Sequence, residues 1–181
     1  MNLFLWGALP YIAFTFLIVG TLVRFFYFER NWTTKSSQFL EKKQLRIANP
    51  LFHFGLLCVI GGHVVGVLIP KTWTAAIGIN DHMYHQGALY MGAVAGLIFI
   101  VGFLLLMKRR FTVAELKVNT SRLDKWLYLF LTLAIFSGMA GTLLNASGFF
   151  DYRVSIGPWF RSLLSFMPDP SLMEGVPFMF K

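Results

Sequence analysis

Four long apolar stretches without a charged residue alternate with more polar connections along this chain. They cover residues 3–23, 51–70, 86–107 and 126–144. Each is close to the roughly 20 residues that an α-helix needs to cross a hydrocarbon core about 30 Å thick. We therefore predict an all-α polytopic membrane helix bundle with four transmembrane helices, in which residues 1–181 form a single domain.

Shorter amphipathic patterns predict additional helices at the membrane surface. In the first connection, residues 29–49, four apolar residues suit a short helix on the cytoplasmic surface: Phe39, Leu40, Leu45 and Ile47. Residues 156–167 are rich in aromatic and apolar side chains and predict an interfacial helix on the outer leaflet. This second segment could equally be a lid over a lipophilic substrate that enters from the bilayer.

The last residues carry a signal for the start of another helix. Ser171 and Glu174 have the S-x-x-E spacing of a capping box, and the apolar run 176–180 follows directly. In a capping box both side chains accept hydrogen bonds from backbone N–H groups at the start of a helix. We therefore predict that a fifth transmembrane helix begins near Val176.

Composition and charge support a membrane protein and suggest its orientation. Of the 181 residues, 56% are hydrophobic and 13% are charged, whereas soluble domains have about 25% charged residues. The formal net charge is +8, and 12 of the 16 Lys and Arg residues lie in two alternate connections, within residues 24–46 and 108–125. The positive-inside rule places these connections in the cytoplasm and the N-terminus outside. The basic charge thus reflects topology, and we exclude nucleic-acid binding.

Two histidines lie within the second apolar stretch and are the main candidates for a functional site. His53 and His63 are ten residues apart, which on an α-helix is a rise of about 15 Å and a net rotation of about 80°. An ionisable residue inside a membrane span is costly and suggests function, and haem iron is a natural partner for a neutral imidazole. Two ligands at two depths would hold two stacked haems and carry electrons across the bilayer.

Other interpretations of this stretch remain open. A histidine in a membrane helix can simply hydrogen-bond a backbone carbonyl or a neighbouring hydroxyl. Four glycines surround the histidines and suit either a flat porphyrin or ordinary helix packing: Gly55, Gly61, Gly62 and Gly66. The single cysteine, Cys58, excludes an intrachain disulfide and a cysteine-ligated cluster.

Two further histidines, His82 and His85, fall in the predicted outer connection between the second and third spans, which begins at Lys71. Their position at the membrane edge is too shallow for either to face His53 or His63 across a porphyrin. They are either solvated loop residues or catalytic candidates. As catalytic residues they would accept protons from a quinol, because histidine titrates near neutral pH.

Three motifs give the sequence a family resemblance that covers essentially the whole chain. They are Trp32 with Ser36, Ser37, Gln38 and Leu40; NPLFHFGLLCVIGGHVVG at residues 49–66; and LLLMKRRF at residues 104–111. The double-histidine motif is the most specific of them. The sequence resembles the membrane cytochrome b (gamma) subunit of respiratory nitrate reductase, a protein of the bacterial cytoplasmic membrane.

The resemblance implies a quinol-oxidising electron-transfer subunit with five spans and two haem b groups, each ligated by two histidines. The second-span ligands match His53 and His63, and the other two ligands come from the fifth span. The haem at His63 would lie near the outer face, where menaquinol or ubiquinol is oxidised. The haem at His53 would pass electrons to an iron–sulfur (beta) subunit and then to a molybdenum (alpha) subunit that reduces nitrate.

The sequence departs from this family plan because neither fifth-span histidine is present, so we expect a C-terminally truncated chain. Two rivals stay open: a related cytochrome b of another quinone-linked complex, and a haem-free membrane scaffold. Three arginines could contact haem propionates or carboxylates of a partner subunit, or could serve only as topological anchors: Arg46, Arg109 and Arg110.

Overall fold

The computed structural model describes residues 2–28, 39–146 and 151–176, and within these ranges the regular structure is helical. Four helices are long and apolar enough to cross a membrane: Phe4–Tyr27, Lys43–Leu68, Asp81–Thr112 and Arg122–Ala146. Their lengths of 24, 26, 32 and 25 residues exceed the roughly 20 residues that a span requires. The prediction of an all-α membrane protein with four spans is therefore confirmed.

Two of the spans include a π-helical part. The first consists of η1 (Phe4–Ala8) and α1 (Leu9–Tyr27), and the second of α2 (Lys43–His63) and η3 (Val64–Leu68). The third span is α4 (Asp81–Thr112) and the fourth is α6 (Arg122–Ala146). The π-helical turn of the second span therefore begins directly after His63.

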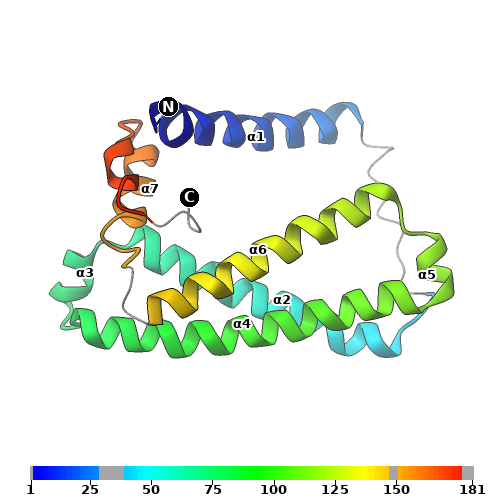
Figure 1. The fold of residues 1–181 in the computed structure, drawn as a ribbon. Coiled ribbons are helices and arrows are strands. Elements are labelled where there is room, and N and C mark those ends of the chain that lie inside the picture. The colour runs from blue at the N-terminus through cyan, green and yellow to red at the C-terminus, as the bar shows by residue number, and fades with distance from the viewer. Residues whose placement is uncertain (1, 29–38, 147–150, 177–181) are drawn as a thin grey trace.

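Short helices lie at the two ends of the long ones. The N-terminal end of the first span, α3 (Lys71–Ala76) and α7 (Ile156–Leu164) lie at one end, which we call the α7 end (Figure 1). The short helix α5 (Ala114–Val118) lies at the opposite end, which we call the α5 end (Figure 1). Consecutive spans thus run in opposite directions, as expected of a chain that crosses a bilayer repeatedly.

The antiparallel pair α2–α4 is the most closely packed part of the molecule. A β-carbon added at Gly55 would lie 2.5 Å from the backbone nitrogen of Phe99, and one at Gly102 would overlap the backbone of Phe52. Small residues let membrane helices approach to backbone contact, and Ala48 is fully buried on the same side of α2. This register fixes the position of each α2 side chain along the helix axis relative to the side chains of α4.

The first and fourth spans are more exposed than the α2–α4 pair, and hydrogen bonds to α7 connect the first span to the rest of the molecule. Among the described residues, α1 and α6 contain none that is buried. The indole Nε1 of Trp159 donates to the carbonyl of Trp6 at 2.8 Å, and the hydroxyl of Tyr11 donates to the carbonyl of Leu163 at 2.8 Å. A helix is thus present at the start of the predicted segment 156–167, over Ile156–Leu164, and its place on the outer leaflet and its lid function stay predictions.

The predicted surface helix in the first connection is wrong for the described residues. Residues 39 and 40 form a turn, and Leu45 and Ile47 belong to the first turns of α2, which starts at Lys43. The helix continues through Pro50. Because neighbouring groups can compensate for the hydrogen bond that a proline removes, such a residue is tolerated within a membrane helix. The histidine span therefore begins eight residues earlier than predicted, whereas Trp32 and residues 36–38 lie outside the described residues.

The expected loop position of His82 and His85 is also wrong, because α4 begins at Asp81. The side chain of Asn80 accepts a hydrogen bond from the backbone N–H of Met83 at 2.8 Å and so caps the helix. Both histidines therefore belong to the first two turns of a long helix rather than to a connection.

The helix-start signal near the C-terminus forms a different structure. Residues Pro170–Met173 form the short 3-10 helix η4, in which the carboxylate of Asp169 accepts hydrogen bonds from the backbone N–H and hydroxyl of Ser171. Asp169 thus takes the capping position that the sequence suggested for Ser171. Val176 is 3% exposed, and residues 177–181, where the predicted fifth span would continue, lie outside the described residues.

Candidate functional site

Each histidine of the second span makes the same hydrogen bond to its own helix. The Nδ1–H of His53 donates to the carbonyl of Asn49 at 2.9 Å, and the Nδ1–H of His63 donates to the carbonyl of Val59 at 2.7 Å. Because a carbonyl oxygen can only accept, these bonds fix the proton on Nδ1 and leave the lone pair on Nε2 free. Ligating histidines in metal sites are commonly oriented by such a bond. A structural histidine in a membrane helix makes the same bond to a backbone carbonyl, so the geometry leaves each Nε2 free and does not by itself assign it a metal.

The surroundings of the two imidazoles leave room for a large flat ligand. Both histidines are exposed, whereas Gly55, between them in sequence, packs tightly against Phe99 of α4. A β-carbon at Gly61 or Gly62 would meet no atom within 4 Å. The histidines therefore lie on a face of α2 that its packing against α4 does not cover.

The chemistry of the donor set fits haem better than a metal held by protein side chains alone. Among the described residues no group of three or more His, Cys, Asp or Glu side chains could enclose a metal ion. A haem iron receives four nitrogens from the porphyrin and needs only axial ligands from the protein. A single histidine at each of two depths, about 15 Å apart along the helix, would supply one axial ligand to each of two haems.

His82 and His85 are separate from this pair. The α2–α4 register places His85 level with Ile69, about six residues or 9 Å beyond His63 along the helix axis. His82 is exposed and lies one turn further out, whereas His85 is partly buried. His85 also lines a small cavity of about 30 Å³, which is room for one or two water molecules.

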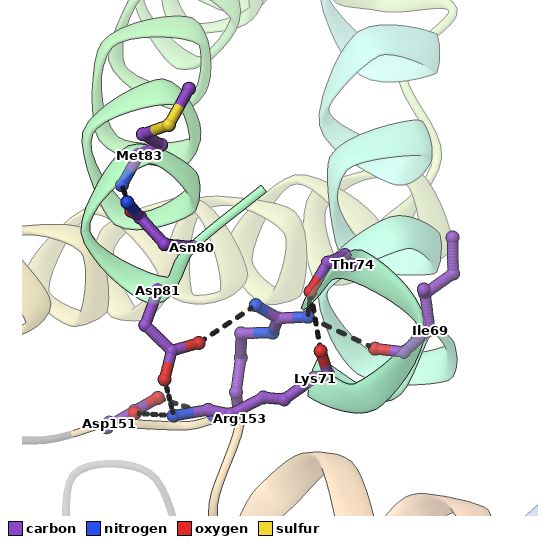
Figure 2. A network of polar contacts seen from close by, with 8 residues as sticks. All are labelled: Ile69, Lys71, Thr74, Asn80, Asp81, Met83, Asp151 and Arg153. Atoms are coloured by element: carbon purple, nitrogen blue, oxygen red, sulfur yellow. Dashed lines mark hydrogen bonds and ion pairs between the residues drawn. The ribbon is translucent and has the colours of Figure 1, made fainter. Parts of the chain in front are cut away.

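A cluster of polar side chains closes the α7 end beside this cavity. We call it the α7-end polar cluster, and it consists of Lys71, Thr74, Asp81, Asp151 and Arg153 (Figure 2). The Lys71 ammonium lies 2.7 Å from Asp151 and 3.4 Å from Asp81. The Arg153 guanidinium donates to the Thr74 hydroxyl at 3.1 Å and lies 3.8 Å from Asp81. The cluster thus joins α3, the start of α4 and the segment before α7.

Burial and charge pairing shift the pKa of two groups in this region. Burial alone would lower the pKa of Lys71, but its hydrogen bond and charge attraction to Asp151, with a further contribution from Asp81, raise the pKa above its ordinary value. Burial raises the pKa of Tyr152 well above its usual range, and the neighbouring Tyr84 adds to this effect. The Lys71 ammonium therefore remains charged around neutral pH, and the Tyr152 phenol remains neutral.

Two ion pairs close the α5 end. The Arg109 guanidinium, 3% exposed, donates to the carboxylate of Glu41 at 2.8 Å and to the Glu41 carbonyl at 2.7 Å. Arg110 donates to the carboxylate of Asp124 at 3.0 Å. Backbone N–H donation from Gln44, and then the hydrogen bond and charge of Arg109, hold the pKa of Glu41 below its ordinary value despite desolvation.

These pairs give two of the three arginines partners within the chain. Arg109 and Arg110 bind carboxylates of this same chain, and their contact with haem propionates or a partner subunit stays a prediction. Arg46 is exposed on the second turn of α2. Sequence reasoning missed Glu41 and Asp124 as partners, although each is one of only two acidic residues in its basic connection.

Comparisons with known proteins agree on one family. Residues 2–181 match the family model described as nitrate reductase gamma subunit. The nitrate reductase gamma chain of Bacillus subtilis (strain 168) is 46% identical over 178 residues, which cover 98% of this chain and 80% of that protein. The respiratory nitrate reductase 1 gamma chain of Escherichia coli (strain K12) is 27% identical over 183 residues, covering 100% of this chain and 81% of that protein.

A third relative has a different size. The nitrate reductase-like protein NarX of Mycobacterium tuberculosis (strain ATCC 25618 / H37Rv) is 38% identical over 179 residues, which cover 97% of this chain but 28% of that protein. The match to the family model and the B. subtilis relative both extend over nearly the entire chain. The chain therefore belongs to the nitrate reductase gamma subunit family.

Proposed function

We propose that the chain is the quinol-oxidising cytochrome b subunit of a membrane-bound nitrate reductase, with His53 and His63 as axial ligands of two haem b groups. The observation that carries the proposal is the matched pair of Nδ1–H bonds, which directs a free Nε2 from each histidine away from its own helix. Family membership supports the same assignment, because the matched relatives are gamma chains of nitrate reductases.

The haem groups would supply one-electron redox chemistry, and the protein would set their positions and potentials. The span holds the two imidazoles about 15 Å apart along its axis, so electrons would pass from the α7 end toward the α5 end. Each histidine provides one axial ligand. His82 and His85 lie too far toward the α7 end to face either of them, so the second axial ligands are not among the four histidines of this sequence.

The α7 end would be the outer, quinol-oxidising side. The C-terminal end of α1, the N-terminal end of α2 and the basic α4–α6 connection lie at the α5 end (Figure 1), which the positive-inside rule assigns to the cytoplasm. His85, beside the water-sized cavity, and the exposed His82 would accept protons from quinol and release them outside. The N-terminus would then also lie outside, in the bacterial cytoplasmic membrane.

The α5 end would bind the catalytic subunits. Electrons from the haem at His53 would pass to an iron–sulfur (beta) subunit and then to a molybdenum (alpha) subunit, where nitrate is reduced. The exposed Arg46 and the basic α4–α6 connection lie on the surface available to such a partner. Arg109 and Arg110 would shape this surface through their internal ion pairs.

Quinol-driven nitrite formation in membranes that contain the whole reductase complex tests the proposed electron path. The His53→Ala and His63→Ala variants should each lose more than about 100-fold of this activity, because even changes outside the first ligand shell of metal sites cost 10–100-fold. A small water-soluble reductant that reaches the cytoplasmic subunits directly should still support nitrite formation. Cys58→Ala, an exposed position between the two histidines on the same helix, is the matched control and should keep full quinol-driven activity.

The proton-acceptor assignment has its own test in the same membranes. His85→Gln should slow quinol-driven turnover and change its pH dependence while haem content stays normal. If His53→Ala and His63→Ala retain quinol-driven nitrite formation, the electron path is wrong and a scaffold function replaces it. If His85→Gln and His82→Gln both keep the normal pH profile, proton acceptance lies elsewhere.

A further inference from the structure

The helix that carries both histidines changes its winding immediately after His63. Residues Val64–Leu68 form the π-helical turn η3, and at Ile69 the backbone becomes extended. π-helical turns are rare and are found frequently at functional sites. The end of a helix also leaves carbonyl oxygens without partners inside the helix, and these need other donors where water is excluded.

Two arginines from the chain segment after α6 satisfy carbonyls at this helix end. Arg161 of α7 donates through Nη1 to the carbonyl of Val67 at 2.7 Å. Arg153 donates through Nη2 to the carbonyl of Ile69 at 3.5 Å, a longer bond drawn in Figure 2. Positive side chains at a helix C-terminus also interact favourably with its partial negative charge. Together they form a double-arginine clamp on the end of the histidine helix.

Close packing fixes the clamp in place. The Arg153 side chain is 5% exposed, and its guanidinium lies 3.6 Å from the ring centroid of Tyr84. A β-carbon at Gly66 would lie 2.9 Å from the Tyr152 hydroxyl, and one at Gly157 would lie 3.2 Å from Nη1 of Arg161. Glycine at these two positions therefore lets α7 and the preceding segment approach the π-helical turn closely.

We infer that Arg161 and Arg153 are positioning residues that hold His63, and that the charge of Arg161 raises the redox potential of the haem that His63 binds, whereas the charge of Arg153 is compensated by Asp81. The inference rests on the proposed haem function. Val67 lies four residues beyond His63, or about 6 Å along the axis, whereas His53 lies about 21 Å from Val67. A positive charge favours the reduced over the oxidised iron, and electrostatic interaction falls with distance. The clamp therefore raises the potential at His63 more than the potential at His53.

Redox titration of haem absorbance in membranes containing the whole complex tests this assignment. Arg161→Gln removes the charge, and it should shift one of two reduction steps to lower potential while the other stays unchanged. The shifted step should be the one that is absent in His63→Ala. Arg161→Lys keeps the charge and should retain the original potentials. Arg122→Gln removes an exposed positive charge at the α5 end and should leave the His63 step unchanged.

The outcomes separate this inference from the proposed function. Two haems with unchanged potentials in Arg161→Gln would overturn the clamp and leave the haem assignment intact. Absence of haem from the unmodified complex would instead overturn the proposed function. If Arg161→Gln fails to accumulate with haem, Arg161→Lys decides: original potentials there support the clamp, and a lowered His63 step there rejects positive charge as its cause.

Discussion

Gly55 of α2 lies against the backbone of Phe99 of α4, so closely that a β-carbon on residue 55 would be 2.5 Å from the Phe99 nitrogen. This contact sets the distance and register of the α2–α4 pair. It also places the tight packing on a different face of α2 from the exposed histidines. The close approach of two helices on one face therefore leaves another face of α2 available to a cofactor.

A larger residue at position 55 should weaken the helix pair. Gly55→Val should destabilise the protein by about 1–3 kcal/mol, the usual cost of overpacking a well-packed contact. Thermal unfolding in detergent measures this loss. Gly92→Ala on α4 is the matched control, since a β-carbon there would meet no atom within 4 Å. Equal unfolding temperatures for Gly55→Val and the control would show that the α2–α4 contact is not required.

The buried pair between Arg109 and Glu41 should stabilise the α5 end in a pH-dependent way. Because the pKa of Glu41 is lowered in the folded protein, its stabilising contribution is present above the ordinary value of 4.5 and is lost as the pH falls through the folded pKa. Glu41→Gln should therefore be less stable than the unmodified protein at pH 7, and the difference should shrink below pH 4.5.

Unfolding in detergent at several pH values checks this prediction. Glu115→Gln on α5 changes an exposed carboxylate near the same end and should have little effect at any pH. A stability difference for Glu41→Gln that stays constant down to low pH would contradict an ionised Glu41 as the stabilising group.

Lys71 should stabilise the α7 end in the opposite pH range. Its pKa is raised in the folded protein, so its contribution is complete below the ordinary value of 10.5 and is lost as the pH rises through the folded pKa. Lys71→Met should lower stability by up to about 1 kcal/mol, as expected of a partly exposed ion pair. Hydrogen exchange at the start of α4 should report the loosening. Unchanged exchange at neutral pH would mean that the α7-end polar cluster holds together without Lys71.

The sequence predicts the spans well because each is encoded locally. Twenty apolar residues are enough to identify a span, and the ten-residue spacing of His53 and His63 directly predicts their separation on a helix. The first turns of α4 could also have been recognised, since Asn80 followed by Asp81 is a helix-start signal. This cap places His82 and His85 within the helix rather than in a loop.

The features that the sequence does not predict depend on contacts between segments that lie far apart along the chain. Arg109 and Glu41 are 68 positions apart, and Arg161 and Val67 are 94 positions apart. No local pattern shows that Gly66 will face Tyr152, or that the helix will become π-helical after His63. These features arise when α7 and the segment before it pack onto the end of the histidine helix, so only the tertiary structure shows them.

Haem quantitation combined with reduced-minus-oxidised spectra is the most direct test of the central claim, that His53 and His63 each hold one haem. The measurement uses purified complex containing this chain, and compares the unmodified protein with His53→Ala, His63→Ala and the control Cys58→Ala. The account predicts b-type bands with two haems for the unmodified protein and control, and loss of a different haem in each histidine variant. Equal haem content in all four proteins, or no haem in any of them, would contradict it.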